Sequence, residues 1–145
     1  FMPDYSLNMS IDLTWFKCNM LYSRWAAKNG MGYPEMMVLY GLYAFKCSSQ
    51  KEIAEHCGIV KQTVNTVVHD LEKHGLIEMT PSKTDKRSRI ISLTDAGQAY
   101  AMEKIGPLLD TEKQICHQIG SDRISSAVET LDLFNVLFER NLNEV

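Results

Sequence analysis

The chain has 145 residues, a formal net charge of −3 and 45% hydrophobic residues. This length permits one sizeable core but is short for two independent domains of usual size. No apolar run approaches the roughly 20 residues that a membrane-spanning helix needs, and the sequence does not open with a charged-then-apolar signal pattern. We therefore expect one cytoplasmic domain over residues 1–145, with no membrane partner.

The first predicted element is a helical arm over residues 8–30. Asn29-Gly30 is a suitable helix stop. The apolar residues of this arm recur at helical spacing: Leu13, Phe16, Cys18, Met20, Leu21 and Trp25. Methionines and tyrosines then fill the segment that begins at Met31. Met36, Tyr40 and Tyr43 have helical spacing, which favours an ordinary core.

Residues 49–75 fit a helix, a tight turn and a second helix, the arrangement of a helix-turn-helix. Ala54 is small enough for two helices to cross closely. Gly58 takes a positive φ without Cβ strain. Val64 supplies a buried aliphatic contact. The other apolar residues of the pair follow helical spacing: Ile53, Ile59, Val67, Val68 and Leu71.

A polar face lies opposite this apolar stripe on the second helix. It contains Lys61, Gln62, Thr63, Asn65, Thr66 and His69. Several of these residue types bond base edges and phosphates, so the face suits a recognition helix in a major groove. We add Ser49 and Gln50, which open the first helix, to the candidate DNA contacts. An ordinary solvated helix face is the alternative.

A basic hairpin follows this helix pair and supports the DNA-binding interpretation. Leu76–Thr80 and Arg89–Leu93 are short strand-like runs around a polar tip, Pro81–Ser88. We call this hairpin the wing. Its candidate DNA contacts are Lys83, Asp85, Lys86, Arg87 and Ser88. A basic loop beside a recognition helix can reach the minor groove or the phosphates.

Further helices are predicted for the rest of the chain, residues 98–145. Thr94 can cap the first, and Gly106-Pro107 is expected to bend or break it. Ser121 begins a last helix with more apolar surface than a lone terminal helix should carry. Its apolar residues are Ile124, Val128, Leu131, Phe134, Val136, Leu137 and Phe138. Residues 8–30 and 98–145 are therefore predicted to be dimerisation helices of a two-fold homodimer. A helical bundle within one chain is the alternative.

The charge distribution agrees with this division. Residues 48–97 hold seven Lys or Arg and seven Asp or Glu, so the flanking helices carry the whole net charge of −3. Within residues 48–97, the basic side chains gather at the wing and at the start of the recognition helix. A neutral segment gives weak attraction to DNA for each protomer. We expect the protein to depend on two half-sites bound at once.

The sequence resembles the MarR family of winged-helix transcriptional regulators. The resemblance rests on IAEHCGIVKQTVNTVVHDLEKHGLI followed by DKRSRIISLTDAG, and it extends over nearly the whole chain. It implies a mainly α fold with a small β-hairpin wing, in which residues 33–97 form the winged helix-turn-helix between N- and C-terminal dimerisation helices. It also implies that Arg87 enters the minor groove and that Asp85 helps to orient it.

The same resemblance implies two ways to regulate DNA binding. Similar proteins place an effector pocket between the first arm and the winged segment, where a small aromatic molecule would meet Tyr22, Met31, Tyr33, Met37 and Tyr40. The hydroperoxide sensors of the family place a reactive cysteine in the first helix. Cys18 has that place here, with Tyr22 one helical turn later. A buried, inert thiol is favoured for Cys18, and Cys57 is expected to be buried.

The sequence therefore predicts a DNA-binding regulator, most simply a repressor released by a small molecule. The alternatives are a peroxide sensor using Cys18 and a winged-helix module that binds protein or RNA instead of DNA. No enzyme motif occurs, so no catalytic residue is proposed. His69 and His74 are five residues apart and do not share a helix face, so neither a metal site nor a cofactor is expected.

Overall fold

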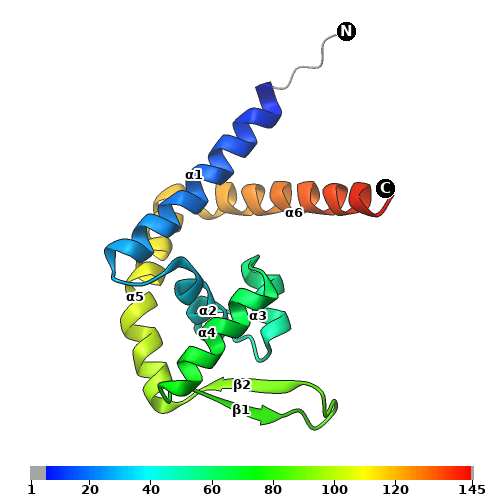
Figure 1. The fold of residues 1–145 in the computed structure, drawn as a ribbon. Coiled ribbons are helices and arrows are strands. Elements are labelled where there is room, and N and C mark those ends of the chain that lie inside the picture. Colours follow the sequence, from blue (N-terminus) through cyan, green and yellow to red (C-terminus); the bar gives the residue numbers. More distant parts are fainter. Residues whose placement is uncertain (1–5, 145) are drawn as a thin grey trace. The chain divides into compact units, whose positions relative to one another are not determined.

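The computed structural model describes residues 6–144, which form six helices and one β-hairpin (Figure 1). The chain divides into two compact units, with the boundary between Ile105 and Gly106. The elements in chain order are α1 (Ser6–Lys28), α2 (Tyr33–Tyr43), α3 (Gln50–Cys57), α4 (Lys61–Lys73), β1 (Ile77–Pro81), β2 (Arg89–Leu93), α5 (Asp95–Ile119) and α6 (Ser121–Asn143). This confirms the predicted mainly helical fold with a small hairpin.

The turn between α3 and α4 has the predicted geometry. Gly58 ends α3 in the left-handed region, at φ 62° and ψ 34°, and its N–H donates to the Ala54 carbonyl. The N–H of Ile59 donates to the same carbonyl at 3.2 Å. Val64, on the inner face of α4, is completely buried. The two helices thus form the expected pair, with α4 in the place of the recognition helix.

The core of the first unit is built around α2. This helix contacts α1, α3, α4 and β2. Its side chains Met36, Val38 and Leu39 are completely buried. A helix that neighbours cover on several sides needs apolar residues all round, which is why α2 carries so few charges.

The wing is an antiparallel hairpin in which Ile77 pairs with Leu93 and Pro81 with Arg89. The first strand begins one residue later than predicted, at Ile77. Leu76 belongs instead to the turn that ends α4, since its N–H donates to the Leu71 carbonyl at 2.9 Å. Proline is tolerated at the other end of β1 because a strand end needs no further ladder donor.

Thr94 caps α5, as predicted. Its Oγ1 accepts a hydrogen bond from the Gly97 N–H at 3.0 Å and donates to the Gly75 carbonyl at 2.8 Å. We expected Gly106-Pro107 to bend or break the helix. The break does not occur, because α5 continues through Pro107 to Ile119. The proline removes one backbone donor from the helix. Thr111 also donates its hydroxyl to the Pro107 carbonyl at 2.8 Å.

The second unit contains the last part of α5 and all of α6. No residue of α6 is buried in the single chain, within the part that the structure describes. The exposed side chains include large apolar residues: Val128, Leu131, Leu133, Phe134, Val136, Leu137, Phe138 and Leu142. None of the helices within residues 6–144 is long and apolar enough to cross a membrane.

Candidate nucleic-acid interface

Helix α4 presents its polar face to solvent. Lys61, Gln62, Asn65, Thr66 and His69 are exposed, whereas Thr63 is half-buried. The opposite face is anchored in the core by the buried residues Val64, Val68 and Leu71. The N-terminal end of α4 carries the positive end of the helix dipole, next to Lys61. This end of the helix therefore attracts phosphate while the face behind it offers amide and hydroxyl groups.

The first turn of α3 is bound to this polar face. The Gln50 Nε2 donates to the Asn65 Oδ1 at 3.2 Å, although the two residues lie 15 positions apart. The neighbouring Ser49 has a structural role, since its Oγ accepts the Glu52 N–H at 3.1 Å and caps α3. The pattern Ser-x-x-Glu at Ser49 and Glu52 is the signal from which this cap could have been predicted.

The residue before this turn also connects the helix pair to the wing. The Ser48 carbonyl accepts the N–H of Ile91, in β2, at 2.8 Å. The Ser48 N–H in turn donates to Glu52 Oε2 at 2.7 Å. Ser48 could not be identified from the sequence, because a contact between this loop and a strand more than 40 residues later leaves no local pattern. The wing and α4 are thus both attached to the start of α3.

The wing tip is held by its own hydrogen bonds. Asp85 Oδ1 accepts the Arg87 N–H at 2.9 Å, and Asp85 Oδ2 accepts the Ser88 hydroxyl at 3.0 Å. The Ser82 Oγ accepts the N–H groups of Thr84 and Asp85 at 3.3 Å. Asp85 therefore orients Arg87 through the backbone. Ser82 was missed because a serine within a polar loop is not distinctive.

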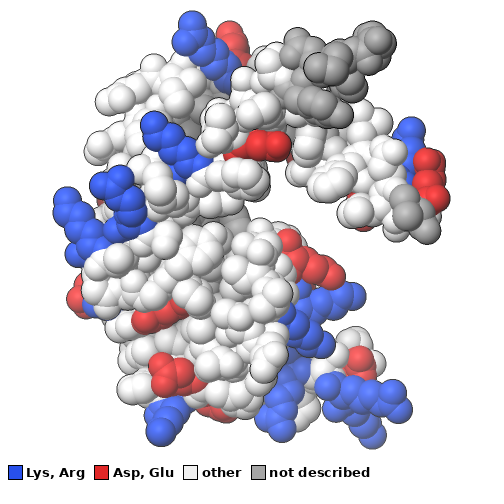
Figure 2. All heavy atoms as spheres, turned by 45° about the horizontal axis from the view of Figure 1, so that its top comes forward, with Lys and Arg blue, Asp and Glu red and all other residues white. Residues whose placement is uncertain are grey.

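The basic side chains at the wing tip are open to solvent. Lys83, Lys86 and Arg87 are exposed. The guanidinium of Arg87 makes no hydrogen bond or ion pair with any part of the chain from residue 6 to residue 144. Figure 2 shows Lys and Arg side chains gathered at the lower right, where the wing lies. The Asp85 carboxylate is engaged locally, so the tip offers unpaired positive charge.

A second link inside the first unit joins α2 to α5. The Tyr100 hydroxyl donates to Glu35 Oε1 at 2.5 Å. Burial, followed by this hydrogen bond, raises the pKa of Tyr100 to about 12. Tyr100 is therefore a neutral donor across the physiological range. Next to this pair is an open hollow of about 380 Å³ lined by Glu35, Thr66, Val67, His69, Asp70 and Lys73.

The predicted effector-pocket residues lie mainly within the packed structure. Met31 is buried, and Tyr22, Tyr33, Met37 and Tyr40 are half-buried. The ring of Tyr40 packs edge-on against Phe45 with 5.0 Å between centroids. These positions agree with the core interpretation, and the effector pocket stays a prediction.

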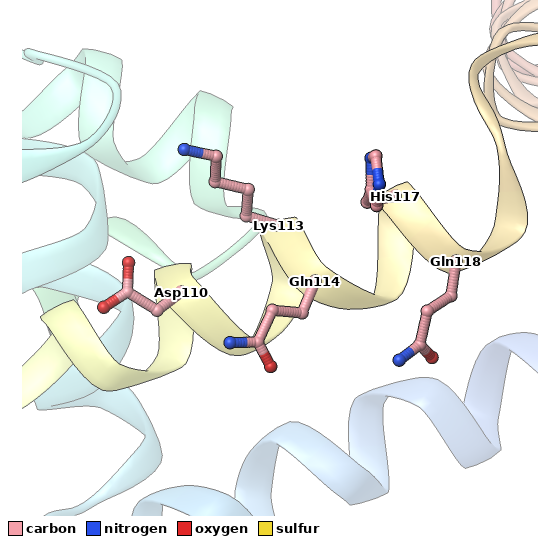
Figure 3. A pocket seen from close by; sticks show the side chains of 5 residues that line it. All are labelled: Asp110, Lys113, Gln114, His117 and Gln118. Carbon is pink, nitrogen blue, oxygen red and sulfur yellow. The ribbon is translucent and has the colours of Figure 1, made fainter.

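A larger hollow, of about 730 Å³, lies along the last part of α5. Among the described residues, the side chains that line it come from successive turns of that helix: Asp110, Lys113, Gln114, His117 and Gln118 (Figure 3). Lys113 and His117 project from one side of the helix in this view, and Gln114 and Gln118 from the other. These side chains do not converge on one point, so we do not interpret the hollow as a binding site.

The cysteines fall into two classes. Cys18 and Cys116 are exposed, whereas Cys47 and Cys57 are buried. The expectation that Cys18 is buried is therefore wrong for the single chain, because no other part of the first unit covers that stretch of α1 within the residues that the structure describes. Cys57 is buried as expected. Burial raises its pKa to about 11, and its Sγ donates to the Met37 carbonyl at 3.3 Å, which makes it a poor nucleophile.

Comparisons with known proteins agree with this geometry. The family model described as MarR family matches residues 29–88. The organic hydroperoxide resistance transcriptional regulator of Bacillus subtilis (strain 168) is 30% identical over 106 residues, which cover 72% of this chain and 71% of that protein. The structure of NMB1585, a MarR family regulator from Neisseria meningitidis, covers 99% of both chains at 29% identity, with a TM-score of 0.81. The transcriptional repressor CouR, bound to a 23-mer DNA duplex, covers 89% of this chain and 92% of its own at 24% identity, with a TM-score of 0.64.

Proposed function

Because the chain belongs to the MarR family of transcription regulators, we propose that it binds double-stranded DNA sequence-specifically, as a homodimer on a pseudo-palindromic operator. The observation that carries this proposal is the combined surface of α4 and the wing. The exposed polar face of α4 suits a major groove, and the unpaired Arg87 at the wing tip suits the adjacent minor groove or phosphates.

The homodimer accounts for the exposed apolar side chains of the terminal helices. In α6, apolar residues recur every three or four positions along one face: Ile124, Val128, Leu131, Phe134, Phe138 and Leu142. In α1, Leu13 and Phe16 are about two-thirds exposed. A second copy of the chain would cover such surfaces and present two recognition helices to half-sites about 34 to 36 Å apart. Repression that a small-molecule effector releases is the simplest mode of regulation for this arrangement.

The Arg87→Ala variant tests the wing. We expect its affinity for a duplex selected from a random-sequence library to fall roughly 5- to 100-fold, and the slope of log affinity against log salt to fall by about one. The reason is the loss of one unpaired cation at the wing tip. Fluorescence anisotropy at several salt concentrations measures both quantities. Arg140→Ala, which removes an exposed arginine of α6, is the matched control and should bind like the unmodified chain. Equal affinity and slope for Arg87→Ala would contradict the wing assignment.

A peroxide-sensing function is the second candidate, and the exposure of Cys18 favours it. The 30% identical relative is named for organic hydroperoxide resistance. In the proposed step, the Cys18 thiolate attacks a peroxide oxygen, so that an S–O bond forms and the O–O bond breaks. The sulfur is oxidised to sulfenic acid, and the hydroperoxide is reduced to its alcohol.

The Cys18→Ser variant tests this step. We expect an organic hydroperoxide to abolish duplex binding by the unmodified chain and to leave binding by Cys18→Ser within about twofold, because only the thiol forms a sulfenic acid. Cys116→Ser is the matched control, since Cys116 is the other exposed cysteine, and it should remain sensitive. Anisotropy before and after treatment, with mass spectrometry of the oxidised chain, gives the result. Binding that hydroperoxide does not change would exclude this candidate and favour a ligand effector.

A further inference from the structure

The hydrogen bond between Gln50 and Asn65 is the feature that the proposed function leaves unexplained. Asn65 lies on the exposed polar face of α4, where a side chain would ordinarily sample several rotamers. Here its Oδ1 accepts from the Gln50 Nε2 at 3.2 Å. The backbone of Gln50 is fixed at the start of α3, directly after the cap residue Ser49, and its side chain is half-buried. The Asn65 carboxamide is thus held by a neighbour in another helix.

The direction of this bond determines what Asn65 still offers. A side-chain amide has two N–H donors and an oxygen with two lone pairs. The bond to Gln50 uses one lone pair of the Asn65 oxygen, so the other lone pair and both N–H donors remain. Adenine presents an N–H donor at N6 and an acceptor at N7 in the major groove, and asparagine reads this edge with one acceptor and one donor. The remaining groups of Asn65 match adenine.

We propose that Gln50 is a positioning residue that holds the Asn65 carboxamide in the orientation that reads adenine in each operator half-site. This inference rests on the proposed DNA-binding function and deepens it. Holding a side chain before binding avoids the entropy loss of fixing it in the complex, which corresponds to roughly 2- to 12-fold in affinity. Gln50 therefore acts through Asn65, and its effect is confined to the base that Asn65 contacts.

The experiment compares base preferences of variants at each operator position. A selection from a random-sequence library first gives the preferred duplex of the unmodified chain, and anisotropy then measures the four bases at each position. Asn65→Ala should lose adenine preference at one position of each half-site. Gln50→Met, which keeps the length but removes the donor, should lower adenine preference at the same position by roughly 2- to 12-fold. In a chain that already carries Asn65→Ala, Gln50→Met should cause little further loss of adenine preference.

Two further variants separate positioning from folding and charge. Gln98→Met makes the same chemical change at an exposed glutamine of α5 and should leave every base preference unchanged. Gln50→Glu cannot donate to the Asn65 oxygen, so it should also lower adenine preference; a general repulsion from DNA would affect all four bases alike. Thermal unfolding of each variant checks that the helix pair is intact.

The outcomes distinguish the two levels of the proposal. If the unmodified chain shows no sequence-specific duplex binding, the proposed function is wrong. Specific binding by the unmodified chain leaves two results that contradict the positioning role. In the first, Gln50→Met changes base preference at a different operator position from Asn65→Ala. In the second, Gln50→Met lowers adenine preference by the same factor when Asn65 is alanine. Either result would mean that Gln50 contacts DNA by itself. Loss of adenine preference at one shared position, without additivity, supports the role.

Discussion

Replacing Gly97 with alanine is expected to destabilise the first unit by about 3 kcal/mol or more, which is the upper range for overpacking a buried site. Gly97 is buried in the first turn of α5, where a Cβ would overlap the carbonyl oxygen of Leu76 and lie 2.8 Å from its carbonyl carbon. The obstacle is backbone, so no side-chain rotation can relieve it. That carbonyl also accepts the Thr94 N–H at 3.1 Å, which holds it in place.

Thermal and urea unfolding of the full chain measure this effect. Gly32→Ala is the matched control, because a Cβ there would only meet the Pro34 ring at 3.6 Å, an ordinary contact, and should change the free energy of unfolding by less than about 1 kcal/mol. Gly97 lies where the turn after α4 meets the start of α5. Its substitution should therefore also displace the wing and weaken duplex binding. A Gly97→Ala chain that unfolds like the control would show that the two backbones can separate at little cost.

The helix-turn-helix could be predicted from the sequence because each of its requirements is local. The positive φ at Gly58 and the burial of Val64 follow from the turn and from helical periodicity. The Thr94 cap is also local, because its hydroxyl accepts the N–H of a residue only three positions later. The requirement for glycine at position 97 could not be predicted in this way. A Cβ there would meet the carbonyl of Leu76, 21 positions earlier, and only folding brings the two positions together.

The rest of the site depends on contacts that spacing does not encode. Helical periodicity identifies the apolar side of α1, but it does not say whether anything in the same chain covers it, so the burial of Cys18 was predicted wrongly. Gln50 and Asn65 were both predicted as DNA contacts, but the bond between them follows from the crossing of α3 and α4. Gly106-Pro107 indicated a bend or a break in the sequence, and the structure excludes the break, because α5 continues through Pro107.

The apolar face of α6 leads to the prediction with the largest expected effect on DNA binding. Phe134 and Phe138 lie one helical turn apart, with ring centroids 6.0 Å apart, and both are about half-exposed in the single chain. Introducing a carboxylate at each position would place charges in the proposed subunit interface without a partner, which is strongly unfavourable. The double variant Phe134→Glu and Phe138→Glu should therefore be monomeric.

Loss of the dimer should lower operator affinity by at least about 100-fold. Within a dimer, binding of one half-site holds the second recognition helix at a high effective concentration near the other, an advantage of roughly 10²- to 10⁴-fold that a monomer lacks. Light scattering should show the mass falling from twice the 16.5 kDa of one chain to that of a single chain. Ser126→Glu adds charge to α6 away from the apolar stripe and should remain dimeric. If the double variant remains dimeric and binds the operator with full affinity, α6 does not contribute to the subunit interface. The interface would then be expected on α1, which carries the other large group of exposed apolar side chains.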